Sequence, residues 1–192
     1  MGKTGKALAI AGIVVVAILL IFFLSIKGTY NSLVQSDEGV KAAWAQVENQ
    51  LQRRYDLIPN YVETVKGYAK HEKEVFLRVT EARSKVGGAT NIKDKIGANN
   101  ELSSALSRLL LVVERYPDLK ANQNFIRLQD ELAGTENRIA VERRRYNEAV
   151  RAYNVKIRSF PTNILAGMFG FTGAEFFKAP PEAKEVPKVE FK

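Results

Sequence analysis

The sequence predicts an all-α protein, with an N-terminal transmembrane helix followed by an antiparallel four-helix bundle of two long and two short helices. Three features carry this prediction: a charge-free apolar run near the N-terminus, apolar residues that recur at steps of three and four, and clusters of Gly, Asn or Pro between them. The expected parts are a basic tail at residues 1–6, a transmembrane anchor at 7–26, a helical stalk and bundle at 27–160, an apolar membrane-proximal segment at 161–177 and a disordered tail at 178–192.

The anchor is expected at residues 7–26, which are 20 residues without a charged side chain. A helix of that length spans the hydrocarbon core of a bilayer. The run exceeds the roughly 7–15 apolar residues of a signal peptide, and no A-x-A-like cleavage site follows it. Because the chain contains no cysteine, a lipoprotein is excluded. The sequence therefore predicts an uncleaved anchor.

The charges that flank the anchor predict its orientation. Lys3 and Lys6 precede it, and Lys27 follows it. The positive-inside rule then favours a cytoplasmic N-terminus. We expect a single-pass protein of the cell inner (cytoplasmic) membrane, with its folded domain outside the cytoplasm.

The first long helix follows the anchor, and its apolar residues keep the spacing of an amphipathic helix with a coiled-coil-like seam. These residues are Val40, Trp44, Val47, Leu51, Tyr55, Ile58, Val62, Val65 and Ala69. Pro59 lies inside the run, and an interior proline bends a helix or removes a hydrogen bond. Because the spacing keeps its phase across Pro59, the pattern predicts a kinked but continuous helix, with a break as the alternative.

Two short helices are expected next. Helix propensity falls near residue 70, which predicts a reversal, and a short amphipathic helix then runs to about Val86. Residues 87–100, GGATNIKDKIGANN, have the Gly and Asn content of a loop. Asn99 or Asn100 is therefore expected to cap the following helix, and Pro117 to end it.

The last long helix is expected from about Asn122 to Arg158, with Pro161 closing it. Each long helix has about 38 residues and is roughly 57 Å long, against roughly 24 Å for each short helix. Short connections favour antiparallel neighbours. These lengths and connections therefore predict a two-helix stalk below a four-helix bundle. They also predict that Phe160 lies at the level of Tyr30, beside the membrane.

Several long stretches resemble bacterial LemA-family proteins. They include YNSLVQSDEGVKAAWAQVENQLQRRYDLIPNYVETVKGYAKHEKEVFLRVTEAR, LSRLLLVVERYPDLKANQNFIRLQDELAGTENRIAVERRRYNEAVRAYN and FPTNILAGMFGF. The resemblance covers roughly residues 30–172 and the N-terminal anchor. It implies a single-pass membrane protein with an all-α four-helix domain. It implies no established activity, and it links the chain only by association with neighbouring membrane proteases of the HtpX type.

The sequence offers little catalytic chemistry. His71 is the single histidine, and beside a predicted turn it is expected to be a capping or surface residue. The run HEKEV lacks the second histidine of HExxH, and without cysteine there is no thiol nucleophile or Cys-ligated metal. We expect a non-enzymatic protein without catalytic residues, cofactor or metal. An unrecognised hydrolase that uses Ser, Glu or Asp is the alternative, and labelling of Ser103, Ser104 or Ser107 by activity probes would support it.

Residues 160–171, FPTNILAGMFGF, are too short to span a bilayer. Three positions are open for this segment and its continuation: packed on the end of the bundle, inserted into the membrane interface, or in contact with a neighbouring subunit. The residues expected to make membrane or oligomer contacts are Phe160, Ile164, Leu165, Met168, Phe169, Phe171, Phe176 and Phe177.

Residues 138–158 carry seven Lys or Arg residues against Glu142 and Glu148. Arg151, Lys156 and Arg158 are candidates for binding lipid headgroups, with a solvated helix face as the alternative. The tyrosines of this stretch fall on the seam, so nucleic-acid binding is not expected. The residues expected to pack the stalk are Trp44, Val47, Leu51, Tyr146 and Tyr153.

These features together predict a non-enzymatic, membrane-anchored helical scaffold or adaptor that contacts membrane lipid and self-associates as a homo-oligomer. An accessory partner of an HtpX-type membrane protease in envelope stress is one alternative, and the hydrolase is the other.

Overall fold

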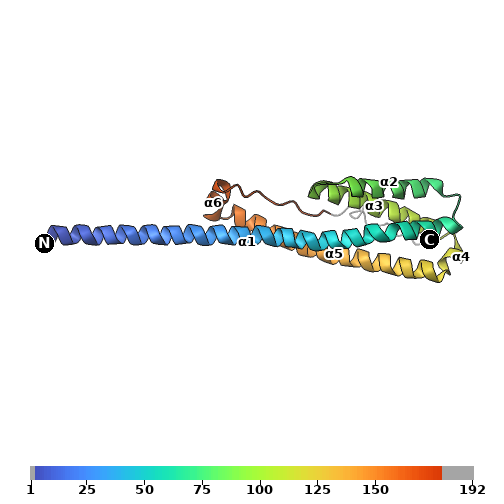
Figure 1. The fold of residues 1–192 in the computed structure, drawn as a ribbon, viewed down its shortest axis with the longest axis horizontal. Helices are drawn as coiled ribbons and strands as arrows, with labels where there is room; N and C mark the ends of the chain where they lie inside the picture. The colour runs from blue at the N-terminus through green and yellow to red at the C-terminus, as the bar shows by residue number, and fades with distance from the viewer. Residues whose placement is uncertain (1–2, 179–192) are drawn as a thin grey trace, which may run out of the picture. The chain divides into compact units, whose positions relative to one another are not determined.

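The computed structural model describes the backbone of residues 3–178 and the side chains from residue 12 onward. The described chain is all α, which confirms the predicted fold class. Its helices are α1 (Lys3–Tyr68), α2 (Lys73–Gly88), α3 (Ile92–Val113), α4 (Pro117–Lys120), α5 (Gln123–Arg158) and α6 (Thr162–Met168) (Figure 1).

The chain divides into two compact units. One combines residues 1–42 with 148–174, and we call it the two-helix unit because its long described helices are parts of α1 and α5. The other combines residues 43–147 with 175–192, and we call it the four-helix unit because parts of α1 and α5 pack in it with α2 and α3. Each unit is described separately below.

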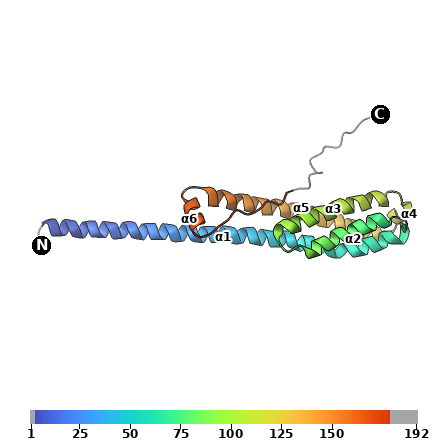
Figure 2. The same cartoon turned by 90° about the horizontal axis from the view of Figure 1, so that it is seen from above.

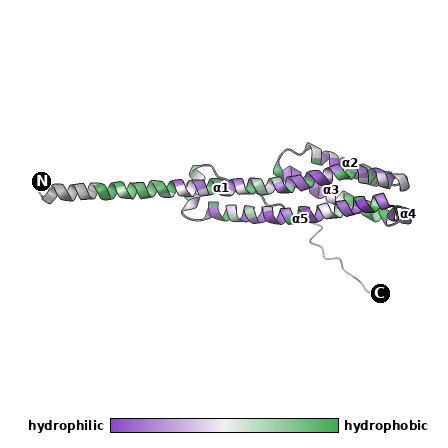
Figure 3. Ribbon diagram, turned by 60° about the horizontal axis from the view of Figure 1, so that its bottom comes forward, coloured by the Kyte–Doolittle hydropathy of each residue, from purple (hydrophilic) through white to green (hydrophobic). Residues whose placement is uncertain are grey.

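Helix α1 is a single element of 66 residues. It therefore joins the predicted anchor and the first long helix without interruption, and it confirms the continuity predicted across Pro59. The turns that follow its grey N-terminal stretch in Figure 3 are strongly hydrophobic, and the large side chains exposed from Ile13 to Leu24 are apolar. Around Pro59 the helix is supported by burial of Ile58 and Tyr61, which lie on adjacent turns of the core face.

The core of the four-helix unit draws apolar side chains from every helix in it. Figures 1 and 2 show α2 and α3 as an antiparallel pair. The buried cluster includes Ile58, Tyr61, Val65, Phe76, Val79, Leu102, Leu109, Val113, Leu119, Phe125 and Leu132. This core confirms the expected antiparallel bundle of two long and two short helices.

The predicted loop at residues 87–100 is wrong over most of its length, because α2 continues to Gly88 and α3 begins at Ile92. Asn91 is the cap: its Oδ1 accepts a hydrogen bond from the Asp94 backbone N–H at 2.8 Å, and its Nδ2 donates to Asp94 Oδ2 at 2.6 Å. This reciprocal pair satisfies a donor at the helix start. Asn99 and Asn100 lie inside α3 instead of capping it.

The other boundaries agree with the sequence pattern. The reversal near residue 70 is confirmed, since α1 ends at Tyr68 and α2 begins at Lys73. Asn122 Oδ1 accepts from the N–H groups of Asn124 and Phe125, which fixes the start of α5. Helix α4 was not predicted. Pro117 is its first residue, a position whose backbone N–H would have no partner within the helix, so the proline removes no hydrogen bond.

The two-helix unit packs residues of α1 against the last turns of α5. Leu33 and Val150 are fully buried, and Val40 and Tyr153 are nearly so. The Lys156 ammonium donates to the Ser32 backbone oxygen at 3.0 Å and to Ser36 Oγ at 2.6 Å, which links the two helices. The predicted disordered tail, apart from Lys178, lies outside the described residues.

Candidate functional site

Helix α6 is a short helix that ends in a Schellman motif. The N–H of Phe171 donates to the Ala166 oxygen at 2.9 Å, and the N–H of Gly170 donates to the Gly167 oxygen at 3.4 Å. Gly170 has φ +74°, a conformation that glycine adopts without steric cost. Ala166, beneath the turn, is buried. Gly170 therefore stops the helix and redirects the chain.

Aromatic contacts hold the end of α6 against α1 inside the two-helix unit. The Phe169 ring lies edge-on to the Tyr30 ring, with 4.8 Å between centroids, and the Phe171 ring lies 6.0 Å from Tyr30. Edge-to-face pairs at these separations are favourable. Phe169 and Phe171, at the end of the FPTNILAGMFGF stretch, therefore lie beside Tyr30. The level of Phe160 itself stays a prediction.

The outer surface of this turn exposes large apolar side chains. Phe160 is 80% exposed, Met168 72%, Ile164 55% and Phe169 48%. Leu165 and Phe171 are half-buried. We call Phe160, Ile164, Met168 and Phe169 the α6 apolar surface. A water-exposed surface of this composition indicates a contact site.

The chain beyond α6 has no regular secondary structure, and hydrogen bonds tie it to α5 within each unit. In the two-helix unit, Tyr153 OH donates to the Thr172 oxygen at 3.0 Å, and Asn154 pairs with the backbone of Ala174. In the four-helix unit, Tyr146 OH donates to the Glu175 oxygen at 2.8 Å, and Asn147 pairs with the backbone of Phe177.

Phe177 is only 4% exposed and lies against Trp44, with ring centroids 6.3 Å apart. The expectation that Phe177 offers surface to a membrane or a second subunit is therefore wrong, because this side chain completes the four-helix unit. Its neighbour Phe176 remains 42% exposed. Sequence pattern could not separate the two residues, since they are adjacent and chemically identical.

The three headgroup candidates differ in their surroundings. Arg151 and Arg158 are exposed on α5. Lys156 is half-buried and donates to Ser32 and Ser36, so its ammonium serves the packing of α5 on α1.

The residues expected to pack the stalk are all buried. Trp44, Val47, Leu51 and Tyr146 lie in the four-helix unit, and Tyr153 lies in the two-helix unit. The Trp44 and Tyr146 rings meet edge-on, with centroids 5.3 Å apart. Burial raises the pKa of the Tyr146 hydroxyl, with a smaller contribution from Glu175. These side chains are packing residues in the described chain.

Sequence reasoning missed a buried charge, Arg54, which is 2% exposed in the four-helix unit. Its guanidinium donates to Glu136 Oε2 at 2.7 Å, to Ser103 Oγ at 2.8 Å and to Asn99 Oδ1 at 2.8 Å. Glu136 is half-exposed and supplies the balancing charge. Arg54 could have been found, because it falls on the seam at steps of three and four from Leu51 and Ile58.

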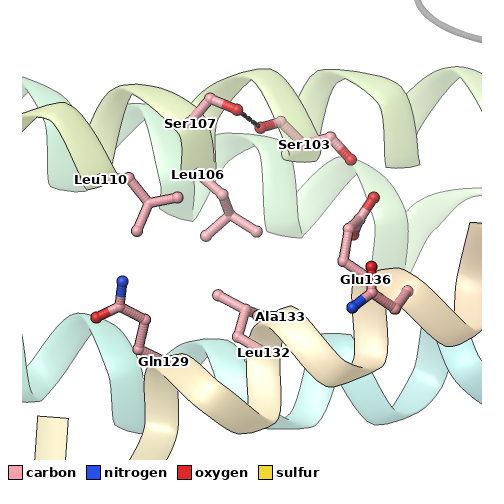
Figure 4. A pocket seen from close by; sticks show the side chains of 9 residues that line it. Ser103, Leu106, Ser107, Leu110, Gln129, Leu132, Ala133 and Glu136 are labelled. Atoms are coloured by element: carbon pink, nitrogen blue, oxygen red, sulfur yellow. Dashed lines mark hydrogen bonds between the residues drawn. The ribbon is translucent and has the colours of Figure 1, made fainter. Parts of the chain in front are cut away.

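An open pocket of about 360 Å³ lies between α3 and α5 beside this arginine (Figure 4). Leu106 and Leu110 of α3 face Leu132 and Gln129 of α5 across it, as Figure 4 shows. Ser103 and Glu136, both bound by Arg54, stand at one end. The pocket thus has an apolar floor and a polar rim, which is typical of a site that binds a peptide or a small ligand.

The hydroxyl groups proposed for a hydrolase have structural partners. Ser103 Oγ donates to the Asn99 oxygen and also accepts from Arg54, and Ser107 Oγ donates to the Ser103 oxygen. Ser104 is half-buried on α3. Within the described residues, no group of three or more His, Cys, Asp or Glu side chains is placed to hold a metal ion.

One helix of the described chain is long and apolar enough to cross a membrane, judged by length and composition. It is α1, searched from Gly12 onward, and its most apolar window has a mean hydropathy of 2.4 with none of that window buried. This stretch coincides with the predicted anchor.

Comparison with known proteins identifies relatives. Residues 43–191 match the family model described as the LemA family, so the match extends beyond the resemblance noted at residues 30–172 and includes most of the C-terminal tail. Magnetosome protein MamQ 1 of Paramagnetospirillum magneticum is 29% identical over 186 residues, which cover 83% of this chain and 68% of the relative. Magnetosome protein MamQ of Magnetospirillum gryphiswaldense is 27% identical over 189 residues, covering 85% and 70%. Protein LemA of Metamycoplasma hominis is 25% identical over 171 residues, covering 88% and 76%.

Proposed function

Because the chain belongs to the LemA family, we propose that it is a non-enzymatic, single-pass membrane-anchored helical scaffold that self-associates. The observation that carries the proposal is the contact of Tyr30 with Phe169, which holds the α6 apolar surface beside the helix turns that follow the anchor. The scaffold then has a second membrane contact in addition to its anchor.

Helix geometry supports placing this surface in the lipid interface. Tyr30 lies four residues after Ile26, the end of the charge-free run, so it stands about 6 Å along the helix axis from that end. The polar layer on each side of a bilayer's hydrocarbon core is roughly 5–8 Å thick. Phe169 shares the level of Tyr30, and aromatic side chains favour that layer.

The nearby charges are consistent with the same position. Arg158 precedes Phe160 by two residues and is exposed, and Lys27 follows the anchor directly and is also exposed. Each Lys or Arg near an anionic leaflet contributes on the order of 1 kcal/mol of attraction. Apolar side chains and flanking cations together suit a lipid surface. The position of the folded domain outside the cytoplasm is proposed from the charges that flank the anchor alone.

Self-association is supported by apolar surface in the two-helix unit. Val155 on α5 is 60% exposed, and the α6 apolar surface adds Ile164 and Met168, which are 55% and 72% exposed. We propose that a second copy covers these side chains in part. Partnership with a membrane protease stays a prediction, because no contact or charge pattern described above favours it over a second copy.

The lipid contact is tested with single cysteines in the full-length chain, which has none of its own. Met168→Cys carries a spin label in nanodiscs, and Leu111→Cys, 71% exposed in the four-helix unit, is the matched control. The label at residue 168 should be more accessible to oxygen and less accessible to a water-soluble nickel chelate than the label at 111. Equal accessibilities at the two positions would contradict the lipid contact.

Self-association is tested separately by native mass measurement of the full-length protein in detergent and in nanodiscs. We expect oligomers that Val155→Asp dissociates and that Leu111→Asp leaves intact. A monomer under both conditions would refute self-association while leaving the lipid contact in place.

A further inference from the structure

The last described residues of the four-helix unit, Glu175 to Lys178, are held on α5 through their backbone. Tyr146 OH donates to the Glu175 oxygen at 2.8 Å. Asn147 Oδ1 accepts from the Phe177 N–H at 2.8 Å, and its Nδ2 donates to the Phe177 oxygen at 3.0 Å. Two neighbouring α5 side chains thus bind three backbone groups of this segment.

Within residues 175–178, Phe177 is the residue whose side chain is buried, and the other three side chains are exposed. The Phe177 ring lies against Trp44, with centroids 6.3 Å apart, and the Arg143 guanidinium lies 5.6 Å from its centroid. A cation over an aromatic ring at that distance is favourable. The ring therefore fills a site that an aromatic side chain and a cation form together. We call Trp44, Arg143, Tyr146 and Asn147 the Phe177 site.

The Phe177 site is separate from the main core of the four-helix unit. The buried cluster of that core contains residues from Ile58 on α1 to Leu132 on α5. Trp44, Tyr146 and Phe177 are buried, but none of them belongs to that cluster. Removing the Phe177 ring should therefore uncover Trp44 while leaving the main core packed.

This combination of contacts is typical of peptide recognition. Hydrogen bonds to the main chain of a peptide contribute affinity, and a pocket for one of its side chains contributes specificity. Tyr146 and Asn147 supply the first kind of contact, and Trp44 and Arg143 supply the second. Because a short covalent connection gives an effective concentration in the millimolar range, even a weak contact keeps the chain's own segment in place.

We propose that the Phe177 site is a peptide-binding site, whose ligand is a peptide segment that carries phenylalanine and lacks regular secondary structure. Residues 175–178 occupy it as an internal competitor, so a partner segment binds when it displaces them. The inference goes beyond the lipid contact and the self-association proposed above, because it concerns side chains of the four-helix unit.

Trp44 reports directly on this site, because it is the only tryptophan of the chain. In the full-length protein in nanodiscs, Phe177→Ala should shift the Trp44 emission to longer wavelength and increase its quenching by acrylamide. Phe176→Ala, at the adjacent position that is 42% exposed, is the matched control and should change neither. Unchanged quenching in Phe177→Ala would overturn the proposal.

Peptides added to the Phe177→Ala variant test whether the site binds a ligand. The capped peptide GAEFFK, which repeats residues 173–178, should protect Trp44 from acrylamide again. GAEFAK lacks the buried ring and should bind at least about tenfold more weakly. GAEAFK keeps that ring and should bind as GAEFFK does. Equal protection by GAEFFK and GAEFAK, or protection by neither, would overturn the proposal.

A further variant tests the backbone contacts. Asn147→Ala, added to Phe177→Ala, should weaken the binding of GAEFFK about tenfold, because it removes two hydrogen bonds to the peptide backbone. Asn137→Ala, at an exposed position of the same helix, is the matched control and should leave the affinity unchanged. Equal affinities in the two double variants would place the peptide elsewhere and overturn the proposal.

The wild type tests the competition. Fluorescently labelled GAEFFK should bind it at least about tenfold more weakly than it binds Phe177→Ala, since the attached segment competes. Equal binding would refute the internal competitor. Circular dichroism verifies that each variant keeps its helices. If Phe177→Ala lost them, GAEFFK added during refolding should restore the helical signal and GAEFAK should not, and no recovery with GAEFFK would overturn the proposal.

Discussion

In the four-helix unit, the apolar faces of α1 and α5 are covered by α2 and α3, whereas in the two-helix unit the same two helices are covered by α6 and an extended segment. The first arrangement buries a continuous cluster of apolar side chains. The second leaves Val155, Ile164 and Met168 more than half exposed and relies on hydrogen bonds such as those from Lys156 to α1. The same spacing of apolar residues along α1 and α5 thus gives a buried core in one unit and an exposed apolar surface in the other.

The difference shows that the spacing of apolar residues along a helix decides which face is apolar. The number of helices and segments that pack on that face then decides whether it becomes a core or a contact surface. The four-helix unit is closed enough to bury a charge, Arg54, with partners on three side chains. Burying a charge requires such partners, because water is no longer available. Four pairs of substitutions measure the contrast, and they follow in order of expected effect.

The largest effect is expected from Arg54→Ala, which removes a buried cation and leaves Asn99 and Ser103 without their donor. We expect a loss of about 3–5 kcal/mol in the free energy of unfolding. Urea unfolding in detergent, followed by Trp44 fluorescence, measures it. Arg53→Ala, at an exposed position next to it, should change stability by less than about 0.5 kcal/mol. Similar values for both variants would show that the buried arginine contributes nothing specific.

A matched pair of core truncations compares the two units directly. Leu102 and Leu33 are both 0% exposed, one in each unit. We expect Leu102→Ala to cost about 4 kcal/mol and Leu33→Ala about 2 kcal/mol, because a less enclosed site collapses more easily around a cavity. Local amide exchange in α3 and in residues 27–42 measures the two costs. A larger cost at Leu33 would reverse our comparison of the units.

The asparagine contacts offer the same chemistry in each unit. Asn154→Ala and Asn147→Ala each remove two hydrogen bonds, worth about 2 kcal/mol together. Exchange of the Ala174 and Phe177 amides should accelerate in the corresponding variant. Unchanged exchange at both amides would mean that neither contact persists in solution.

The smallest effect concerns two buried phenols. Tyr153→Phe should cost about 1 kcal/mol, because the Tyr153 hydroxyl donates to Thr172. Tyr61→Phe should change little at neutral pH, because within the described residues the buried Tyr61 hydroxyl has no hydrogen-bond partner. Unfolding measurements on both variants provide the comparison, and an equal cost would contradict it.

The contribution of Tyr61 to the free energy of unfolding should fall at high pH. Burial raises its pKa from 10.0 to about 12, so the neutral phenol is favoured in the fold. Its contribution to stability is complete below pH 10, where the unfolded chain is also protonated, and is lost as the pH rises from 10 to 12. Phenolate absorbance of the wild type and Tyr61→Phe measures this titration, and a transition near pH 10 would show that the site is open to water.

Much of the fold was predictable, because its boundaries have local chemical causes. Pro59 did not interrupt the apolar phase, the last long helix was expected from about Asn122, and the helix lengths predicted that the segment after it returns toward Tyr30. The region around Asn99 was misjudged, since its Gly and Asn content is typical of a loop. There the tertiary contact with Arg54 and the cap at Asn91 outweigh local propensity.

The candidate site was only partly predictable. The α6 apolar surface follows from composition, but the separate roles of Phe176 and Phe177 depend on which side of the extended segment faces Trp44. Lys156 was assigned to lipid because its charge is visible in the sequence, whereas its partners Ser32 and Ser36 are more than a hundred residues away. Contacts of that separation leave no local pattern.

The paired amides of Asn147 and Asn154 recognise peptide groups and are indifferent to side-chain identity. These contacts leave the exposed positions of the segment free to vary, whereas Phe177 is also held by its side chain, which is buried against Trp44. Proline is the exception at 174 and 177, where its missing N–H would leave an asparagine oxygen unpaired. Replacing the exposed residues Thr172, Glu175, Phe176 and Lys178 with unrelated proline-free residues should therefore preserve the path of the chain, as long as Gly173 and the buried Phe177 are kept.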